Sequence, residues 1–298
     1  MDHGHSGDVV VVAARGDAAA VALVTGLRRR GRRALLVDET AVVSARLEHR
    51  PASGRTDPGG PGTGALPGDV LRLASGYPVG PATGAVVWRL DGFPVAQLPP
   101  EHHEYAECEG FAAGLSWLTG LGEVALNRPD PLGLAGARVD LLGLHRLAAS
   151  CGLSVPAFDL RSNDAAAGRP PTALLTAQWE PPGLPDAAVP VPAATGPRLP
   201  RPAFRVEPVV RERPVLVLED EVVGPDRTTA VTSAPAIARL VAAAGLRCGE
   251  VGLGRSRSGR LVVTGLSPIP SLRQPGHLAA LTDYLEQRVG ARTAGVAA

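Results

Sequence analysis

Four residues combine a side chain suited to binding with a place beside a predicted strand: Arg89, Phe93, Asn127 and Arg213. Ligands of open α/β sheets bind where parallel strands end, and Arg89 and Asn127 each follow a short apolar run. A guanidinium binds carboxylates and phosphates, and an amide donates and accepts hydrogen bonds. The competing interpretation is a solvated charge for Arg89 and, before Pro129, a turn cap for Asn127. We therefore predict an edge that binds a ligand or a partner.

The aromatic residues gather around this edge. The chain has three Trp, three Tyr and four Phe, and half of these ten lie within 30 positions: Trp88, Phe93, Tyr105, Phe111 and Trp117. Phe93 lies between Asp-Gly and Pro, a sequence typical of a turn, whereas Phe111 and Trp117 share the inner face of a predicted helix. We expect Phe93→Ala and Arg89→Ala to leave folding nearly intact and to weaken binding of a partner subunit or leader peptide.

Other clusters favour structural roles. His102 and His103 stand beside two glutamates but have no third ligand at zinc spacing, so no metal site is predicted. The five arginines between positions 28 and 33 could hold phosphate, RNA or an acidic peptide. Cations at a helix C-terminus are, however, favourable in themselves, and we prefer that interpretation. No residue is predicted to be catalytic.

The composition limits the function. The 298 residues carry a net charge of +1, so no global field predicts nucleic acid or a membrane surface as a partner. No apolar run approaches the roughly 20 residues that span a bilayer, and we expect a soluble, cytoplasmic protein. The three cysteines are expected to be buried free thiols. All 30 basic residues are arginine and none is lysine, as expected from a genome biased toward G and C. The same nucleotide bias explains the many glycines and prolines, which we discount as functional signals.

Apolar periodicity predicts the elements that position these residues. Strands at 9–14 and 33–37 flank a helix at 18–30, a β-α-β unit that favours a parallel sheet. Further strands are expected at 71–73, 85–90, 123–127, 154–160, 213–223, 251–253 and 259–266, and further helices at 99–118, 130–151, 234–244 and 277–289. The alternation of strands and helices predicts an α/β fold.

The order of several motifs resembles a known family. Trp88-Arg89 precedes a Glu-rich helix, Asn127-Arg128-Pro129 follows, and Gly152-Leu153-Ser154-Val155-Pro156 closes the next segment. This order resembles the ATP-grasp ligases that crosslink ribosomal peptides through ester and amide bonds (graspetide or microviridin-type synthetases). The segments 213–218, with Arg213, and 240–271 resemble the nucleotide-contacting and metal-binding strands of that family.

The resemblance implies the domain organisation. It implies an ATP-grasp-like α/β fold with an N-terminal parallel-sheet (pre-ATP-grasp) domain at 1–127 and a linker helix and strand at 128–168. A reduced, Pro-rich central segment is expected at 169–208, without the sheet and Gly-rich loop that clasp ATP, and a C-terminal ATP-grasp-like region at 209–298.

The sequence departs from that family where ATP and metal bind. The first ATP-binding Lys would fall near Leu141, and the second in the Pro-rich segment. The metal-binding Glu-x-Asn-Pro motif falls on Gly265-Leu266-Ser267-Pro268, and the upstream acid near Gly252, with Glu250 two residues away. Phosphoryl transfer needs cations and Mg²⁺ held by carboxylate and amide oxygens. We therefore expect neither ATP nor Mg²⁺ as a cofactor.

Three functions remain open. The preferred one is a degenerate, non-catalytic homologue that serves peptide natural-product maturation, with a precursor peptide or a catalytic ATP-grasp ligase subunit as its partner, in a homodimer or heterodimer. The alternative is an active ATP-dependent carboxylate–amine or carboxylate–hydroxyl ligase with Arg in place of Lys, using ATP and Mg²⁺. Its spare carboxylates would be Glu219, Asp220, Glu221 and Glu250. The third is an unrelated small-molecule reaction on the same fold.

Overall fold

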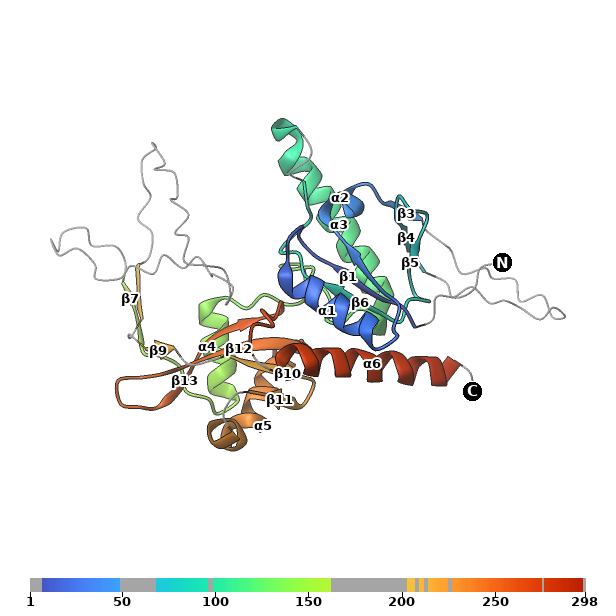
Figure 1. Cartoon of the computed structure of the whole chain (residues 1–298). Helices are drawn as coiled ribbons and strands as arrows, with labels where there is room; N and C mark the ends of the chain where they lie inside the picture. Colours follow the sequence, from blue (N-terminus) through green and yellow to red (C-terminus); the bar gives the residue numbers. More distant parts are fainter. Residues whose placement is uncertain are drawn as a thin grey trace, which may run out of the picture. The chain divides into compact units, whose positions relative to one another are not determined.

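The computed structural model describes residues 7–48, 68–95, 99–161, 203–206, 209–211, 214–224, 227–274 and 276–296 (Figure 1). The chain folds into two compact units. The first unit is Met1–Arg138 with Gly245–Cys248 and Pro275–Ala298, and the second is Val139–Ala244 with Gly249–Gln274. The boundaries predicted at residues 127, 168 and 208 stay a prediction, and most of the Pro-rich segment 169–208 lies outside the described residues.

A three-stranded parallel sheet forms the core of the first unit. Its order is β2 (Ala34–Val37), β1 (Val9–Val12) and β6 (Ala85–Trp88), and all four β1 residues are at most 1% exposed. Four consecutive valines suit a central strand buried on both faces. Helix α1 (Ala18–Arg29) connects β1 to β2, as predicted. It packs against the C-terminal helix α6 (His277–Val296), which belongs to the same unit (Figure 1).

Smaller elements surround this sheet. They are the short helix α2 (Glu39–Val43), the antiparallel strands β3 (Arg46–Glu48), β4 (Val70–Arg72) and β5 (Pro78–Val79), the turn η1 (Pro100–His102) and the helix α3 (His103–Leu121). Trp117 of α3 is buried and meets Trp88 of β6 edge to face, with 6.4 Å between ring centroids. Such a pair favours this packing of α3 against the end of β6.

The strand predicted at 123–127 is wrong in extent. A 3-10 turn, η2 (Gly122–Val124), takes its first residues, and Ala125 then makes a single parallel bridge to Val86. The chain leaves the sheet after Leu126, whose N–H bonds to Val86 O at 2.8 Å, and Pro129 has no N–H with which to extend a ladder. Residues 125–126 thus lie beside β6 at the edge of the three-stranded sheet, and Asn127 follows directly after them.

The helix predicted at 130–151 begins only at Leu141. Helix α4 (Leu141–Ser150) is capped by Asp140, whose Oδ1 accepts the Gly143 N–H at 2.6 Å. Before it, Gly136 has φ +126°, and a β-carbon there would lie 2.6 Å from Leu246 and 2.9 Å from the Asn127 β-carbon. A helical conformation is not compatible with that backbone, so 130–140 is irregular.

The second unit is built on a sheet of order β11-β10-β12-β13, with β9 paired to β12. The pairs β10–β11, β12–β13 and β9–β12 are antiparallel. Besides α4, its elements are β7 (Phe158–Arg161), β8 (Ala203–Val206), β9 (Val210–Arg211), β10 (Val215–Leu218), β11 (Glu221–Val223), α5 (Arg227–Ala243), β12 (Cys248–Arg255) and β13 (Leu261–Ser267). Strands β7 and β8 form a separate pair. The core is apolar, since Leu216, Ile237 and Leu240 are 0% exposed.

The arginine cluster at 28–33 has structural contacts. Arg28 Nε donates to Ala34 O, Arg30 pairs with Asp283 and Glu286 of α6, and Arg33 lies over the Tyr77 ring. These contacts support the structural interpretation. Cys151 and Cys248 are buried as predicted, but Cys108 is exposed on α3, so that expectation is wrong. Among the described helices, none combines the length and apolar character needed to cross a membrane.

Candidate ligand-binding site

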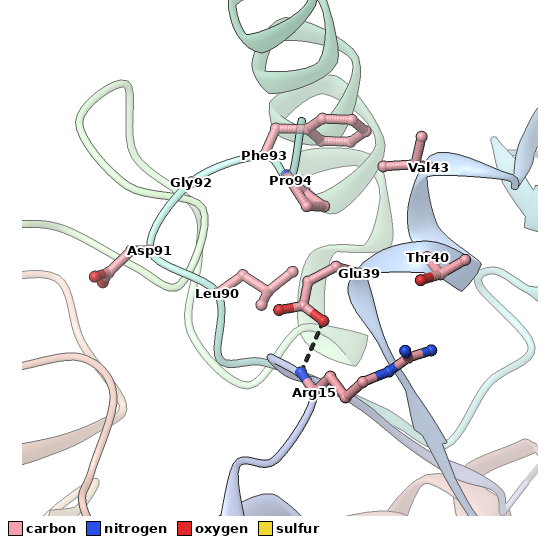
Figure 2. A pocket seen from close by; sticks show the side chains of 9 residues that line it. All are labelled: Arg15, Glu39, Thr40, Val43, Leu90, Asp91, Gly92, Phe93 and Pro94. Atoms are coloured by element: carbon pink, nitrogen blue, oxygen red, sulfur yellow. Dashed lines mark hydrogen bonds between the residues drawn. The ribbon is translucent and has the colours of Figure 1, made fainter. Parts of the chain in front are cut away.

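A pocket of about 430 Å³ opens at the carboxyl edge of the parallel sheet in the first unit (Figure 2). It is lined by Arg15, Glu39, Thr40, Val43, Leu90, Asp91, Gly92, Phe93 and Pro94. These residues belong to the three segments that follow β1, β2 and β6. The pocket therefore lies where ligands of open α/β sheets bind.

Arg15 connects the segment after β1 to helix α2. Its backbone N–H donates to Glu39 Oε2 at 2.7 Å (Figure 2), and its guanidinium contacts Asp38 Oδ2 at 3.3 Å. The N–H of Ala41 and this guanidinium hold the pKa of Asp38 below its usual range, against a smaller effect of burial. Two of the three segments around the pocket are thus tied together by one residue.

Phe93 lies in the predicted turn after β6 and forms one wall of the pocket. Its ring lies on Gly110 of α3, so closely that a β-carbon at that position would overlap the ring. The half-buried ring therefore also packs α3 against the turn. The expectation that Phe93→Ala leaves folding nearly intact must be corrected accordingly, because the truncation removes this packing as well.

Arg89 is neither a solvated charge nor part of the pocket lining. Its side chain is 5% exposed, and Nε donates to Asp17 Oδ2 at 2.8 Å. Asp17 also caps α1, accepting the N–H groups of Ala19 and Ala20. Burial alone would raise the pKa of Asp17, but Arg89 and these N–H groups together hold it below its usual range. Arg89 supports the loops around the pocket, and ligand binding by Arg89 stays a prediction.

Asn127 joins three segments of the first unit. Its Nδ2 donates to Ala135 O at 3.1 Å and to Cys248 O at 2.9 Å, and its Oδ1 accepts the N–H groups of Arg247 and Cys248 at 3.0 and 2.9 Å. A primary amide has two donor hydrogens and two acceptor sites, and all four are used here. The side chain therefore bridges distant segments instead of capping the next turn; ligand binding by Asn127 stays a prediction.

The sequence predictions covered this site only in part. Phe93 lines the pocket, whereas Arg213 lies outside the described residues. Arg15, Glu39 and Gly110 were missed. The position of Arg15 after a buried strand and of Glu39 after the next strand was a usable signal, but discounting glycines as compositional hid the one at position 110.

The positions expected to hold Mg²⁺ lie on the β12–β13 hairpin and do not supply its ligands. Gly252 is the direct cross-strand partner of Gly265, so both positions expected to carry a carboxylate lack a side chain. A β-carbon on Gly265 would meet nothing within 4 Å. Nowhere in the described ranges do three or more His, Cys, Asp or Glu residues gather in a way that could hold a metal ion. The donor set does not fit Mg²⁺, which needs oxygen ligands.

The nearest carboxylate, Glu250, has a structural setting. It lies opposite Ser267, is 0% exposed, and its Oε2 accepts the N–H and the hydroxyl of Ser271 at 3.0 and 2.8 Å. Ser267, at the position expected to carry an Asn, exchanges hydrogen bonds with the backbone of Ile269. These contacts hold the segment that follows β13 against the hairpin.

No protein-family model and no curated protein matches the sequence. Several solved structures match its fold over nearly the whole chain. The ATP-grasp ligase PsnB, complexed with a minimal precursor, Mg and ADP, is 16% identical with a TM-score of 0.60 and covers 95% of this chain and 98% of its own. The macrocyclase MdnC from Microcystis aeruginosa MRC, bound with precursor peptide MdnA, is 13% identical with a TM-score of 0.62. It covers 95% of this chain and 99% of its own.

A RiPP-associated ATP-grasp ligase from Chryseobacterium gregarium, in complex with ADP and a leader and core peptide, shows the same likeness. It is 9% identical, with a TM-score of 0.60, and covers 96% of this chain and 97% of its own. The predicted α/β, ATP-grasp-like fold is thereby confirmed. Likeness at such low identity shows the fold and leaves the activity open.

Proposed function

We propose that this chain is a degenerate, non-catalytic relative of the ATP-grasp peptide ligases that binds a precursor peptide or a catalytic ligase subunit during peptide maturation. The observation that carries the proposal is the Gly252–Gly265 pair on the β12–β13 hairpin, at the positions where the resemblance expects two metal-binding carboxylates. Without these carboxylates, the two positions offer no side-chain oxygen ligands for Mg²⁺.

The loss extends to the groups that would neutralise phosphate. Activation of a carboxylate as an acyl phosphate concentrates negative charge on the transferred group, which positioned cations must stabilise. The chain contains no lysine, and Asp140 and Leu141 stand where the first ATP-binding lysine is expected. Asp140 instead caps α4. An acidic cap at this place is unfavourable for a phosphate ligand.

The proposal that the chain binds a peptide or a ligase subunit is supported by the pocket in the first unit. The pocket at its sheet edge is held by the Arg15–Glu39 and Arg89–Asp17 contacts. The structural neighbours PsnB and MdnC were both solved with precursor peptides. We propose the same class of ligand here, or a ligase subunit that carries it.

Glu250 favours the second candidate, an active ATP-dependent ligase. It is a carboxylate on the strand expected to supply one metal ligand, two residues from Gly252. Its complete burial and its bonds to Ser271 favour the structural interpretation. This candidate therefore makes a distinct prediction, namely nucleotide binding that depends on Mg²⁺ and on Glu250.

Calorimetric titration of the full chain with ATP, with and without Mg²⁺, separates the two candidates. We expect no micromolar binding and no dependence on Mg²⁺. Millimolar binding corresponds to only about −4 kcal/mol, which scattered arginine contacts can supply, and does not support a ligase. A micromolar, Mg²⁺-dependent constant that Glu250→Gln abolishes would overturn the non-catalytic role. Co-purification with precursor peptides and ligases encoded nearby tests the binding half.

A further inference from the structure

We infer that the pocket at the sheet edge accepts the side chain of a basic residue, arginine or lysine, from a bound peptide. The inference rests on the proposed peptide-binding function and names the residue class that this pocket recognises. It combines two observations within the first unit: an apolar wall and a carboxylate inside the pocket that is not paired with a cation among the described residues.

The wall of the pocket suits the aliphatic part of such a side chain. Leu90, Phe93, Pro94 and Val43 line it, and Figure 2 shows the Phe93 ring and Val43 facing each other across it, with Leu90 below. Lysine and arginine bury their methylene groups along apolar surface while their charged ends reach polar groups. A flat cation near an aromatic ring gains further attraction from the ring face.

The carboxylate is that of Glu39, which lies beside Leu90 in Figure 2. Its Oε2 accepts the backbone N–H of Arg15 at 2.7 Å, a contact that fixes the side chain without neutralising its charge. The guanidinium of Arg15 instead pairs with Asp38, and the other carboxylate of the lining, Asp91, pairs with Arg138. Glu39 is thus the charge of the lining that a ligand cation can balance.

Charge complementarity decides between ligand classes. The lining also holds one cation, Arg15, but its guanidinium pairs with Asp38, and Asp91 pairs with Arg138. An acidic side chain would therefore be repelled by Glu39, whereas an uncharged apolar side chain would contact the apolar wall and leave the Glu39 carboxylate without a counter-charge. A charge-assisted hydrogen bond to a guanidinium or ammonium adds stabilisation that an apolar side chain lacks. The pocket therefore prefers a basic side chain to an apolar one of equal length.

The test uses the full, ¹⁵N-labelled chain and acetylated, amidated pentapeptides of four alanines around a central arginine, lysine, norleucine or glutamate. Chemical-shift titration measures affinity and location together. We expect the arginine and lysine peptides to shift the amides of residues 39–43 and 90–93 and to bind about tenfold more tightly than the norleucine peptide. Equal binding of norleucine, or shifts outside the pocket, would overturn the inference.

Glu39→Gln tests the residue itself. Glutamine keeps an oxygen that can accept the Arg15 N–H, so the loops stay in place while the charge is removed. The preference for arginine over norleucine should fall about tenfold, whereas Glu221→Gln, an equal charge change on exposed β11, should leave it unchanged. An unchanged preference in Glu39→Gln would count against the inference. Should that variant unfold, the comparison of peptides on the wild type still decides.

The two proposals fail separately. Mg²⁺-dependent nucleotide binding would overturn the non-catalytic role and leave the preference of the pocket standing. A pocket indifferent to the basic residue would overturn this inference, while absent nucleotide binding would continue to support the non-catalytic role.

Discussion

The carboxyl edge of the parallel sheet and the β12–β13 hairpin differ in the residues that occupy the positions singled out by the resemblance to ATP-grasp ligases. At the sheet edge, Arg89 and Asn127 are buried polar residues whose side chains bond to other segments of the first unit. On the hairpin, the two positions expected to carry metal-binding carboxylates are glycines that face each other, Gly252 and Gly265. The first region has polar side chains at the positions that the resemblance singles out, and the second has glycines there.

The difference separates two reasons for a polar residue to persist. A buried side chain that bonds to distant backbone groups cannot be removed without leaving those groups unsatisfied, so folding alone maintains it. A metal ligand has no such role in the apo fold and is maintained only by the reaction. The fold therefore explains the polar residues at the sheet edge, and the hairpin is the region that bears on the proposed loss of catalysis.

The largest expected effect is that of Asn127→Ala. The truncation removes four hydrogen bonds and leaves buried backbone groups of residues 135, 247 and 248 without them. With each buried unsatisfied group costing about 1–3 kcal/mol and partial relaxation, we expect a loss of about 3–4 kcal/mol. Urea unfolding measures it. The neighbouring Arg128→Ala, an exposed position, should change stability by at most about 0.5 kcal/mol. Similar values for the two variants would remove the structural role assigned to Asn127.

The second largest effect is expected for Arg89→Ala, which should lower the free energy of unfolding by about 2–3 kcal/mol at neutral pH. The truncation leaves the partly buried Asp17 carboxylate without its cation. This corrects the expectation that Arg89→Ala leaves folding nearly intact. That expectation assumed a side chain in contact with solvent or ligand, whereas the structure buries it.

The pH dependence tests the same pair. The folded-state pKa of Asp17 lies below its unfolded value, so its contribution is complete above about pH 4–5 and is lost as the pH falls through the folded pKa. The cost of Arg89→Ala should therefore be largest near pH 7 and shrink toward pH 3. Asp17→Asn, which keeps the cap on α1, should remove this pH dependence. A cost of Arg89→Ala that stays constant with pH would contradict the assigned ion pair.

How much of this was predictable follows from how local each signal is. The β-α-β unit was predictable because apolar runs and helical periodicity are local features of the sequence. The turn at Phe93 was predictable because Asp-Gly and Pro are its direct neighbours. The four bonds of Asn127 reach residue 248, which no local pattern indicates. The prediction of a helix from residue 130 was wrong because apolar periodicity contains no information on the close approach of Gly136 to Leu246. Glu39 belongs to the site through the sheet, which places the ends of β2 and β6 around one pocket.

Ser271→Ala sharpens the comparison from the side of the hairpin. It removes one hydrogen bond to the buried Glu250 carboxylate and should cost about 1–2 kcal/mol, independent of Mg²⁺. Thermal unfolding with and without Mg²⁺ checks this, with the exposed Ser116→Ala on α3 as the control. If Mg²⁺ stabilises the wild type and this effect disappears in Glu250→Gln, then Glu250 is a metal ligand and the hairpin is not degenerate.

The smallest expected effect distinguishes the two facing glycines. Gly265 has no positive φ, and a β-carbon there meets nothing within 4 Å, so Gly265→Ala should change stability by less than about 0.5 kcal/mol or raise it slightly, because alanine restricts the unfolded chain. At Gly252, a β-carbon would lie 2.9 Å from Thr264 Oγ1 and 3.3 Å from the Gly265 backbone N, so Gly252→Ala should cost about 1 kcal/mol. If position 265 is glycine only because no reaction requires more, it must tolerate a side chain. A large loss in Gly265→Ala, measured by urea unfolding beside Gly252→Ala, would mean that the fold itself demands glycine there, and the missing carboxylate would then say nothing about lost catalysis.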